Sequence, residues 1–151
     1  MKIAVFPGSF DPITIGHYDL VKRAIPLFDK IIVAVGINTQ KKYLFDLDKR
    51  KNMLHSVFSE YPSIEIDTFQ NLTAQYCNKM GAKYILRGLR NGSDFDYEKT
   101  ISQINHIVGN GLETMFFISQ PEYSHISSSI VREIIIGGGD ATPFLPEKLI
   151  L

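Results

Sequence analysis

The chain has 151 residues, a length that suits one domain built around one buried core. Apolar residues make up 44% of it and charged residues 21%, which is ordinary for a globular protein and argues against disorder. Sixteen Lys and Arg balance sixteen Asp and Glu, so no global field attracts nucleic acid or an anionic membrane. A site for a polyanion must therefore gather its positive charge locally.

The single cysteine, Cys77, excludes an internal disulfide and a cysteine-rich metal site. It lies in a helix-like segment, where a free thiol usually packs as a small hydrophobic side chain. The apolar stretch at residues 1–6 is too short for a signal peptide or a membrane span. We therefore expect a soluble cytoplasmic protein with one domain that spans residues 1–151.

Short apolar runs rich in Ile, Val or aromatic residues alternate along the chain with helix-like segments. The predicted strands cover residues 2–6, 30–35, 64–69, 83–86 and 113–118. The predicted helices cover residues 18–27, 48–60, 72–80, 94–108 and 128–136, and three consecutive glycines end the last helix. Runs that are apolar on both faces are typical of parallel strands with helices on each side. The alternation predicts an α/β fold with one open, doubly wound, five-stranded parallel sheet.

Segments rich in polar residues and glycine follow the predicted strands rather than precede them. Residues 8–12 follow the first strand, 38–42 the second, 87–90 the fourth and 121–129 the fifth. In open parallel sheets the ligand binds at the carboxyl ends of the strands, where the strand order reverses. These four segments carry side chains suited to phosphate, so we expect them to form one site.

The segment after the first strand reads Gly-Ser-Phe-Asp-Pro-Ile-Thr-Ile-Gly-His, at residues 8–17. Its first glycine permits close backbone approach, and Ser9 offers a hydroxyl to a phosphate oxygen. Thr14 is a candidate N-cap, which places Gly16 and His17 in the first helical turn, where free N–H groups favour an anion. His17 can donate a hydrogen bond to a phosphoryl oxygen, although a lone histidine here also commonly caps or packs its helix.

This segment resembles the GTFDP and T-x-G-H signature of the adenylyltransferase branch of the cytidylyltransferase-like superfamily. Members of that superfamily look like small relatives of class I aminoacyl-tRNA synthetases. Ser9 stands where Thr is common and keeps the hydroxyl, and Ile15 stands where Asn is frequent. The resemblance implies a Rossmann-like domain that binds a nucleotide.

Basic residues mark two of the other strand-end segments. Lys41 and Lys42 follow the second strand, where such a pair is usually solvated surface. Arg87 and Arg90 end the fourth strand, where charge is costly unless it faces a cleft or a partner. Arginine presents a fork of donors that suits phosphate, although structural ion pairing would also explain these two residues.

Arg-Gly-Leu-Arg at residues 87–90, followed by Asp-Phe-Asp-Tyr-Glu at 94–98, closely matches the phosphopantetheine adenylyltransferase family. Glu98 is a poor phosphate ligand, so we expect it to hold adenosine or to orient an arginine; a glutamate on the helix surface is the alternative. Three serines lead into the last helix, where they can cap it and still leave hydroxyl donors for an anion. With the following Ile-Val-Arg-Glu they reproduce the family motif I-S-S-S-x-[VL]-[RK]-E.

The resemblance spans nearly the whole chain and implies a role for each matching position. Ser9 and Lys41 would bind the phosphate of the pantetheine substrate or bridge the two substrates. Thr73 would line the pantetheine arm, and Arg87 would hold its phosphate. ATP would be bound by Ser9, Phe10, His17, Gly88, Leu89, Arg90, Glu98, Tyr123, Ser124, His125, Ile126, Ser127, Ser128 and Ser129. The family also implies a homohexamer, although the tail after Pro146 is shorter than in many relatives.

The implied reaction joins ATP and 4′-phosphopantetheine into dephospho-coenzyme A and pyrophosphate, by direct in-line attack without a covalent enzyme intermediate. The acceptor phosphate is already negative, so the protein must mainly position two polyanions and neutralise their charge. His17 and Lys41 are the expected catalytic residues, His17 at the α-phosphate and Lys41 at the nucleophile. We expect Mg²⁺ to bridge ATP oxygens while it keeps water, because the sequence offers no carboxylate cage and no protein metal ligand.

Parts of this sequence are also compatible with other functions. A sibling transferase could act on nicotinate or nicotinamide mononucleotide or on glycerol phosphate, and the first loop alone does not exclude it. A nucleotide-binding regulator without catalysis is a further alternative. No G-x-G-x-x-G follows the first strand and no G-x-x-x-x-G-K-[ST] occurs, which disfavours a Rossmann dehydrogenase and excludes a P-loop ATPase. The balanced charge gives little support to RNA binding.

Overall fold

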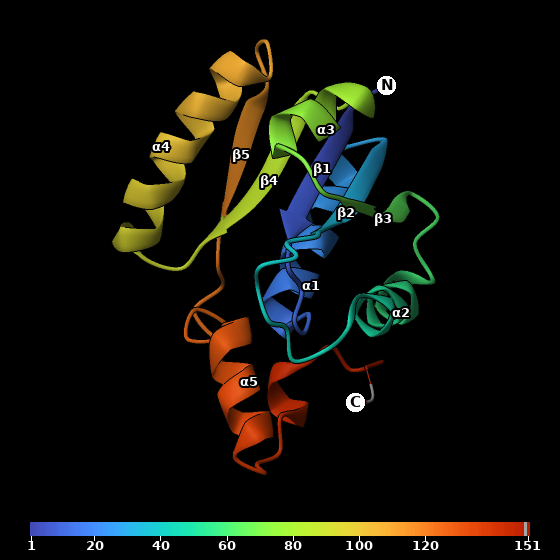
Figure 1. The fold of residues 1–151 in the computed structure, drawn as a ribbon, viewed down its shortest axis with the longest axis vertical. Coiled ribbons are helices and arrows are strands. Elements are labelled where there is room, and N and C mark those ends of the chain that lie inside the picture. The colour runs from blue at the N-terminus through green and yellow to red at the C-terminus, as the bar shows by residue number, and fades with distance from the viewer. Residues whose placement is uncertain (150) are drawn as a thin grey trace.

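A five-stranded parallel sheet with the strand order β3-β2-β1-β4-β5 forms the centre of the structure (Figure 1). Its strands are β1 (Ile3–Gly8), β2 (Lys30–Gly36), β3 (Ile64–Phe69), β4 (Tyr84–Leu89) and β5 (Glu113–Ile118). The helices are α1 (Ile15–Ala24), α2 (Leu47–Phe58), α3 (Thr73–Lys79), α4 (Gly92–Val108) and α5 (Ser128–Ile136), with 3-10 turns η1 (Ile25–Leu27) and η2 (Thr142–Phe144). The computed structural model describes residues 1–149 and 151. The predicted doubly wound α/β fold is confirmed.

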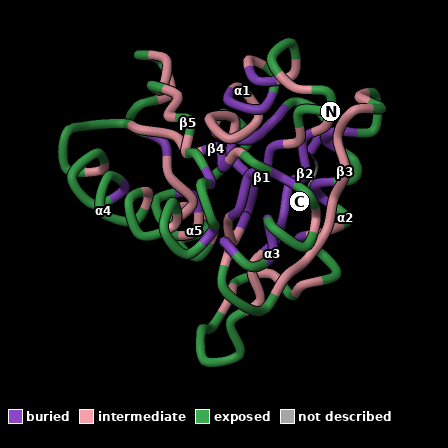
Figure 2. The backbone as a smooth tube through the Cα atoms, turned by 90° about the horizontal axis from the view of Figure 1, so that it is seen from above, coloured by how far each residue is buried: buried purple, intermediate pink, exposed green. Residues whose placement is uncertain are grey.

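Helices cover both faces of the central strands. On β1, Ala4 and Phe6 pack into a core that includes residues of α1, α2 and α5, whereas Val5 points to the other face and packs with α3. Figure 2 shows β1 and β2 largely buried. The edge strands β3 and β5 are only partly buried.

The cysteine of α3 belongs to this core. Cys77 is fully buried in the cluster that α3 forms with the sheet. Burial raises the pKa of its thiol to about 12, so the thiol stays protonated and unreactive at neutral pH. The predicted packing role of Cys77 is confirmed. Among the described helices, none is long and apolar enough to cross a membrane.

β1 and β4 run further toward their carboxyl ends than the sequence predicted. β1 continues through Pro7 to Gly8 because its register with β2 holds to that point, and β4 runs to Leu89. Arg87 therefore lies on a strand and not in a loop. Proline and glycine read as turn residues in a sequence, but pairing with a neighbouring strand overrides that local signal.

β1 is the strand at which the order of the sheet reverses. β2 and β3 lie on one side of it, and β4 and β5 lie on the other. Against β2 the register of β1 holds from Ile3 to Gly8, but against β4 it covers only Ala4 and Val5. β1 and β4 therefore part toward their carboxyl ends, at the point where such folds bind their ligands. In Figure 1 these strand ends are directed toward α5.

Helix α4 stands at the edge of the sheet beside β5 (Figures 1 and 2). Of its 17 residues only Glu98 is buried. Several apolar side chains of α4 are exposed, as is Ile118 at the end of the neighbouring strand β5, and we call this set the α4–β5 apolar face: Ile101, Ile104, Ile107, Val108 and Ile118.

Candidate active site

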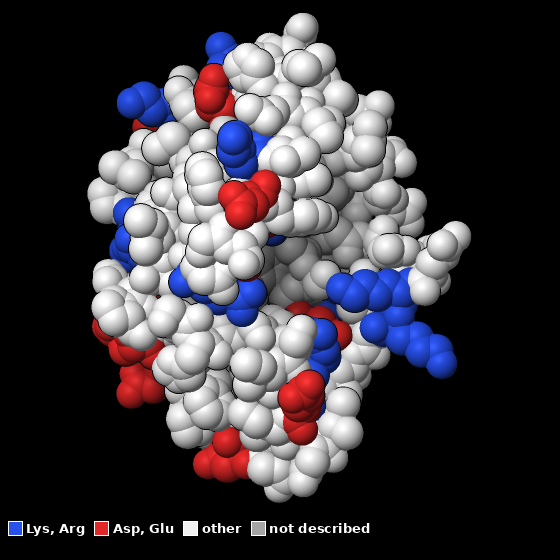
Figure 3. Space-filling model, turned by 90° about the vertical axis from the view of Figure 1, so that its left-hand side faces the viewer, with Lys and Arg blue, Asp and Glu red and all other residues white. Residues whose placement is uncertain are grey.

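A cavity of about 340 Å³ opens at the carboxyl end of the sheet. Its walls come from the ends of β1 and β4, the first turns of α1, the loop after β2 and the segment that leads into α5. Figure 3 shows one face of the molecule that is hollowed, with Lys and Arg side chains around the hollow. The structure thus brings the four predicted segments together. The predicted residues that line the cavity are Ser9, Phe10, His17, Lys41, Arg87, Gly88, Arg90, Glu98, Tyr123, Ile126, Ser127, Ser128 and Ser129.

Four residues of the predicted set lie outside this lining. Leu89 ends β4, and His125 is exposed. Ser124 is exposed as well, and its hydroxyl donates to the carbonyl of Pro121, within its own turn, at 3.1 Å. Thr73 lines a second cavity instead. The motifs span whole segments, but only some side chains of a segment face inward.

The second cavity, of about 270 Å³, adjoins the first. Ser9, Arg87 and Glu98 line both of them, so the two spaces meet at the end of β1. Beyond this junction the second cavity runs between Phe69 and Thr73 on one side and residues of α4 on the other. Two ligands can therefore lie side by side with their ends close to Ser9 and Arg87.

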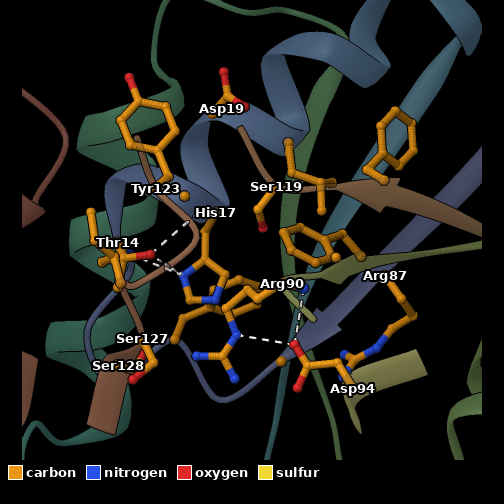
Figure 4. A pocket seen from close by; sticks show the side chains of 18 of the residues that line it. Thr14, His17, Asp19, Arg87, Arg90, Asp94, Ser119, Tyr123, Ser127 and Ser128 are labelled. Carbon is orange, nitrogen blue, oxygen red and sulfur yellow. Dashed lines mark hydrogen bonds and ion pairs between the residues drawn. The ribbon is translucent and has the colours of Figure 1, made fainter. Parts of the chain in front are cut away.

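His17 is held by the start of its own helix. Thr14 N–H donates to Nδ1 of His17 at 3.0 Å, and the Thr14 hydroxyl accepts from His17 N–H at 3.4 Å, which is a reciprocal capping box. Because Nδ1 accepts a hydrogen bond, the proton of the neutral ring lies on Nε2. In Figure 4 the ring lies between Thr14 and Arg90. Capping uses one ring nitrogen and leaves the other for a ligand. His17 can therefore both cap its helix and donate to a phosphoryl oxygen.

The surroundings of His17 keep its ring uncharged. Phe6 and Phe10 pack against it, with ring centroids 6.0 and 5.2 Å away. This burial, followed by the positive charges of Arg87 and Arg90, lowers the pKa of His17 from its ordinary 6.5 to about 4. At neutral pH the cavity therefore presents a neutral Nε2–H donor.

Arg87 lies where β1 and β4 part. Its Nη2 and Nε donate to the two carboxylate oxygens of Glu98 at 2.6 and 3.0 Å, and Nη1 donates to the carbonyl of Pro7 at 2.9 Å. The Glu98 side chain is only 11% exposed, so its charge needs this partner. Glu98 thus orients an arginine, which is one of its two expected roles. The guanidinium of Arg87 borders both cavities and keeps further N–H groups for a ligand.

A carboxylate that the sequence reasoning did not assign fixes Arg90. Asp94 accepts from Arg90 N–H at 3.0 Å and from Arg90 Nε at 3.2 Å, and both residues line the first cavity (Figure 4). Burial alone would raise the pKa of Asp94, but the hydrogen bonds and the charge of Arg90 outweigh it and lower this pKa. Asn91 caps α4 by accepting from Asp94 N–H at 2.9 Å. The ion pair of Arg90 and Asp94 is therefore attached to the capped first turn of α4.

The three serines at the start of α5 make three different contacts. Ser127 caps the helix, because its hydroxyl accepts from Ile130 N–H at 3.2 Å. Ser128 donates to the carbonyl of Pro12 at 2.8 Å, and Ser129 accepts from Arg132 at 3.2 Å. The hydroxyls of Ser127 and Ser129 act only as acceptors in these contacts, so both retain a hydrogen for an anion.

Several further lining residues carried signals that the sequence reasoning did not use. On α1, Gly16, Asp19, Leu20 and Arg23 follow the i, i+3, i+4, i+7 spacing of one helix face. Arg132 follows Ser129 by three positions, one turn along α5. The remaining lining residues that were not assigned include Phe117 and two residues just after β5: Ser119 and Gln120.

Lys41 reaches across the entrance to the first loop. Its Nζ lies 3.4 Å from the hydroxyl of Ser9, although 32 positions separate the two residues. Both side chains line the first cavity, and Ser9 also lines the second. The two residues expected to bridge the substrates are therefore in contact at the junction of the two spaces.

Within the described residues, no group of three or more His, Cys, Asp or Glu is arranged to hold a metal ion. Each carboxylate that lines the first cavity is paired with an arginine: Glu98 with Arg87 at 2.6 Å, Asp94 with Arg90 at 3.2 Å and Asp19 with Arg23 at 3.4 Å. A divalent cation bound here would have to take most of its ligands from a polyphosphate and water.

Comparison with known proteins adds to this geometry. Residues 5–134 match the family model described as cytidylyltransferase-like. A protein of Flavobacterium psychrophilum named phosphopantetheine adenylyltransferase is 48% identical over 149 residues, which is 99% of this chain and 98% of that one. A protein of the same name from Cytophaga hutchinsonii is 47% identical over 148 residues, with 98% and 99% covered.

A solved structure shares the fold at much lower sequence identity. The bifunctional NMN adenylyltransferase/ADP ribose pyrophosphatase of Francisella tularensis superposes with a TM-score of 0.73 at 18% identity. The match covers 95% of this chain and 44% of that one. This likeness shows the fold alone.

Proposed function

The chain belongs to the phosphopantetheine adenylyltransferases of the cytidylyltransferase-like family, and from this premise we propose how its site works. The enzyme transfers the adenylyl group of ATP to 4′-phosphopantetheine, releases pyrophosphate and thereby serves coenzyme A biosynthesis. One observation carries the mechanism: two adjoining cavities share Ser9, Arg87 and Glu98 at the point where β1 and β4 part. One cavity takes each substrate, and the junction takes the reacting phosphates.

ATP occupies the cavity between α1 and α5. The N-termini of both helices open into it, so free N–H groups and the positive ends of two helix dipoles face the triphosphate. Ser127 and Ser129 donate hydroxyl hydrogens, and Arg90 and Arg132 add charge. This arrangement supplies the local positive charge that a chain of zero net charge needs for a polyanion.

The acceptor phosphate lies at the junction of the cavities, and the pantetheine arm extends along the second cavity past Thr73. Lys41 and Arg87 offset the charge of this phosphate, and Ser9 donates a hydrogen bond to it. An oxygen of the acceptor phosphate attacks the α-phosphorus of ATP. The bond between that phosphorus and the bridging oxygen breaks, and pyrophosphate leaves with the electron pair.

His17 serves the same step as a donor to the α-phosphate. Its Nε2–H is fixed in direction by the capping contact at Nδ1, and its low pKa keeps the ring neutral. The donor is thus in place before the reaction and need not reorganise as charge develops. No protein group attacks phosphorus, so no covalent intermediate forms.

Magnesium would be held mainly by the phosphate oxygens of ATP, where it would offset their negative charge. The pairing of the cavity carboxylates with arginines supports this proposal, because it leaves the phosphate oxygens and water as the ligands. The cytoplasm, where ATP is abundant, is the proposed location of the enzyme.

The proposed quaternary structure is a homohexamer. The α4–β5 apolar face supports an interface, because monomers rarely leave so many large apolar side chains together in water. The family resemblance supports the number of subunits. Burial of α4 against a second subunit would also restrict the motion of this helix, which lines the second cavity.

Pyrophosphate release with a panel of acceptors tests the function. Wild-type protein should release pyrophosphate from MgATP with 4′-phosphopantetheine, and only at background rates with nicotinamide mononucleotide, nicotinate mononucleotide or glycerol phosphate. Release with a mononucleotide alone would identify a sibling transferase. Nucleotide binding without release under any condition would identify a regulator.

A further inference from the structure

A buried arginine beside the active site has carbonyl oxygens for partners instead of a carboxylate. Arg50 on α2 is 3% exposed. Its Nε donates to the carbonyl of Phe45 at 3.0 Å, and its Nη1 donates to the carbonyl of Ser9 at 2.9 Å. The guanidinium also lies 3.9 Å from the ring centroid of Tyr43. Burial of such a charge is costly, and packing alone would be served better by an apolar side chain.

A buried carboxylate holds the same loop through its backbone N–H groups. Asp11 is 2% exposed, and its two oxygens accept from Phe45 N–H at 2.9 Å and from Leu44 N–H at 2.8 Å. Phe45 is therefore held at its N–H by Asp11 and at its carbonyl by Arg50.

These contacts close a ring that joins two loops of the active site. Ser9 and Asp11 belong to the segment after β1, and Phe45 belongs to the loop between β2 and α2, which also carries Lys41. Lys41 itself is exposed and contacts Ser9 only through its flexible end. The contacts of Asp11 and Arg50 hold Leu44 and Phe45, three and four residues after Lys41, and so limit where its ammonium group can reach.

We propose that Arg50 and Asp11 are positioning residues for the acceptor phosphate. They lock the segment of Ser9 to the loop of Lys41, so that one phosphate can be held by both side chains at once. The inference depends on the proposed function, because it assigns Ser9 and Lys41 to that phosphate. Neither Arg50 nor Asp11 lines either cavity, so both act through the backbone they hold.

Arg50 is the cleaner of the two residues to test. The backbone of the first loop also accepts from Arg132 at Asp11 and from Ser128 at Pro12, so a change at Asp11 can reach the ATP side. The hydrogen bonds and the aromatic contact that the structure gives the Arg50 side chain are at Ser9, Tyr43 and Phe45. Its loss should therefore act mainly on the acceptor.

The test compares Arg50→Lys with Val57→Ala. Lysine keeps the charge but lacks the fork that bonds two carbonyls at once. Val57 is 1% exposed on the same helix, so its truncation is a matched control for lost stability. Arg50→Lys should lower kcat/KM for 4′-phosphopantetheine on the order of tenfold, chiefly through KM, and leave the KM for ATP within about twofold. Val57→Ala should lower Tm without this selective change.

A double-mutant cycle with Lys41→Ala separates positioning from a structural role. If Arg50 acts through the Lys41 loop, Arg50→Lys should add little to the acceptor KM once Lys41 is gone. Additive effects, equal changes in both KM values, or wild-type kinetics in Arg50→Lys would overturn the inference. Should Arg50→Lys not fold, Asp11→Asn with the same cycle carries the test. If wild-type protein releases no pyrophosphate from ATP and 4′-phosphopantetheine, the proposed function itself fails.

Discussion

At the scale of single residues, His17 shows how one side chain meets a structural and a chemical need. Its Nδ1 completes the cap of α1, and its Nε2 faces the cavity. The sequence showed the spacing of Thr14 and His17 that predicts the cap, and the family signature suggested the chemistry. It did not show that the two roles use different nitrogens, because that depends on the ring orientation set by the cap and the packed aromatic rings.

Substitution of His17 by Asn should separate the two roles. Asparagine can still accept from Thr14 N–H near the place of Nδ1, but it has no donor at the place of Nε2. We expect kcat to fall on the order of 10²–10³-fold, with a modest change in the KM for ATP and a Tm close to wild type. His17→Ala should lose a similar factor in kcat and also about 0.5–1.5 kcal/mol of stability, because Thr14 N–H loses its partner in the ring. If steady-state kinetics of His17→Asn give a kcat near the wild-type value, His17 has only a structural role.

The pH dependence of stability offers a second test of His17. Its pKa is about 4 in the folded protein and 6.5 ordinarily, so between these values the unfolded chain binds the extra proton. The neutral ring thus stabilises the fold fully above pH 6.5, and this contribution is lost as the pH falls toward 4. Urea unfolding of wild type and His17→Asn between pH 4 and 7.5 should show a difference in unfolding free energy that changes in favour of the variant as the pH falls. A difference independent of pH would mean that the ring titrates normally.

At the scale of elements, the ends of β1 and β4 define the site. The apolar runs predicted that these strands exist, and the polar segments after them predicted where a ligand binds. The early parting of β1 from β4 was not predictable, because register depends on contacts between distant segments. For the same reason Arg87 was expected in a loop, whereas it lies on β4 and is fixed by Pro7 and Glu98.

Arg87→Ala should mainly raise the KM for 4′-phosphopantetheine. It should also lower stability by about 1–3 kcal/mol, because the largely buried Glu98 loses its partner, although part of Arg87 reaches solvent. The double variant Arg87→Ala/Glu98→Gln removes the unpaired charge, so Tm should recover while the KM stays high. A rise confined to the KM for ATP would show that Arg87 serves the other substrate.

At the scale of the whole molecule, the alternation of strands and helices predicted the doubly wound sheet because each element carries its own periodic signal. The exposure of α4 could not be predicted in the same way. Its isoleucines belong to the α4–β5 apolar face, because only the tertiary arrangement decides which side chains of a helix the sheet can cover. Such an exposed apolar face supports the proposed assembly.

A charge on this face should weaken the assembly. Ile107 is 80% exposed, so Ile107→Glu should leave the single chain folded while it desolvates a carboxylate in any interface formed there. Light scattering should show a hexamer for wild type and smaller species for the variant. Leu27→Glu, at a half-exposed position on η1, is the control and should keep the wild-type mass. A monomeric wild type, or an unchanged mass in Ile107→Glu, would contradict the proposed interface.

The central claim is that the two cavities hold the acceptor phosphate in line with the α-phosphorus of ATP for one direct displacement. Its most direct test is the stereochemistry of transfer from an ATP analogue that is chiral at the α-phosphorus, such as one epimer of the α-phosphorothioate. A single in-line attack predicts that the dephospho-coenzyme A analogue carries the inverted configuration at phosphorus. Retention of configuration would require two displacements through an enzyme-bound adenylyl group, and it would contradict the account.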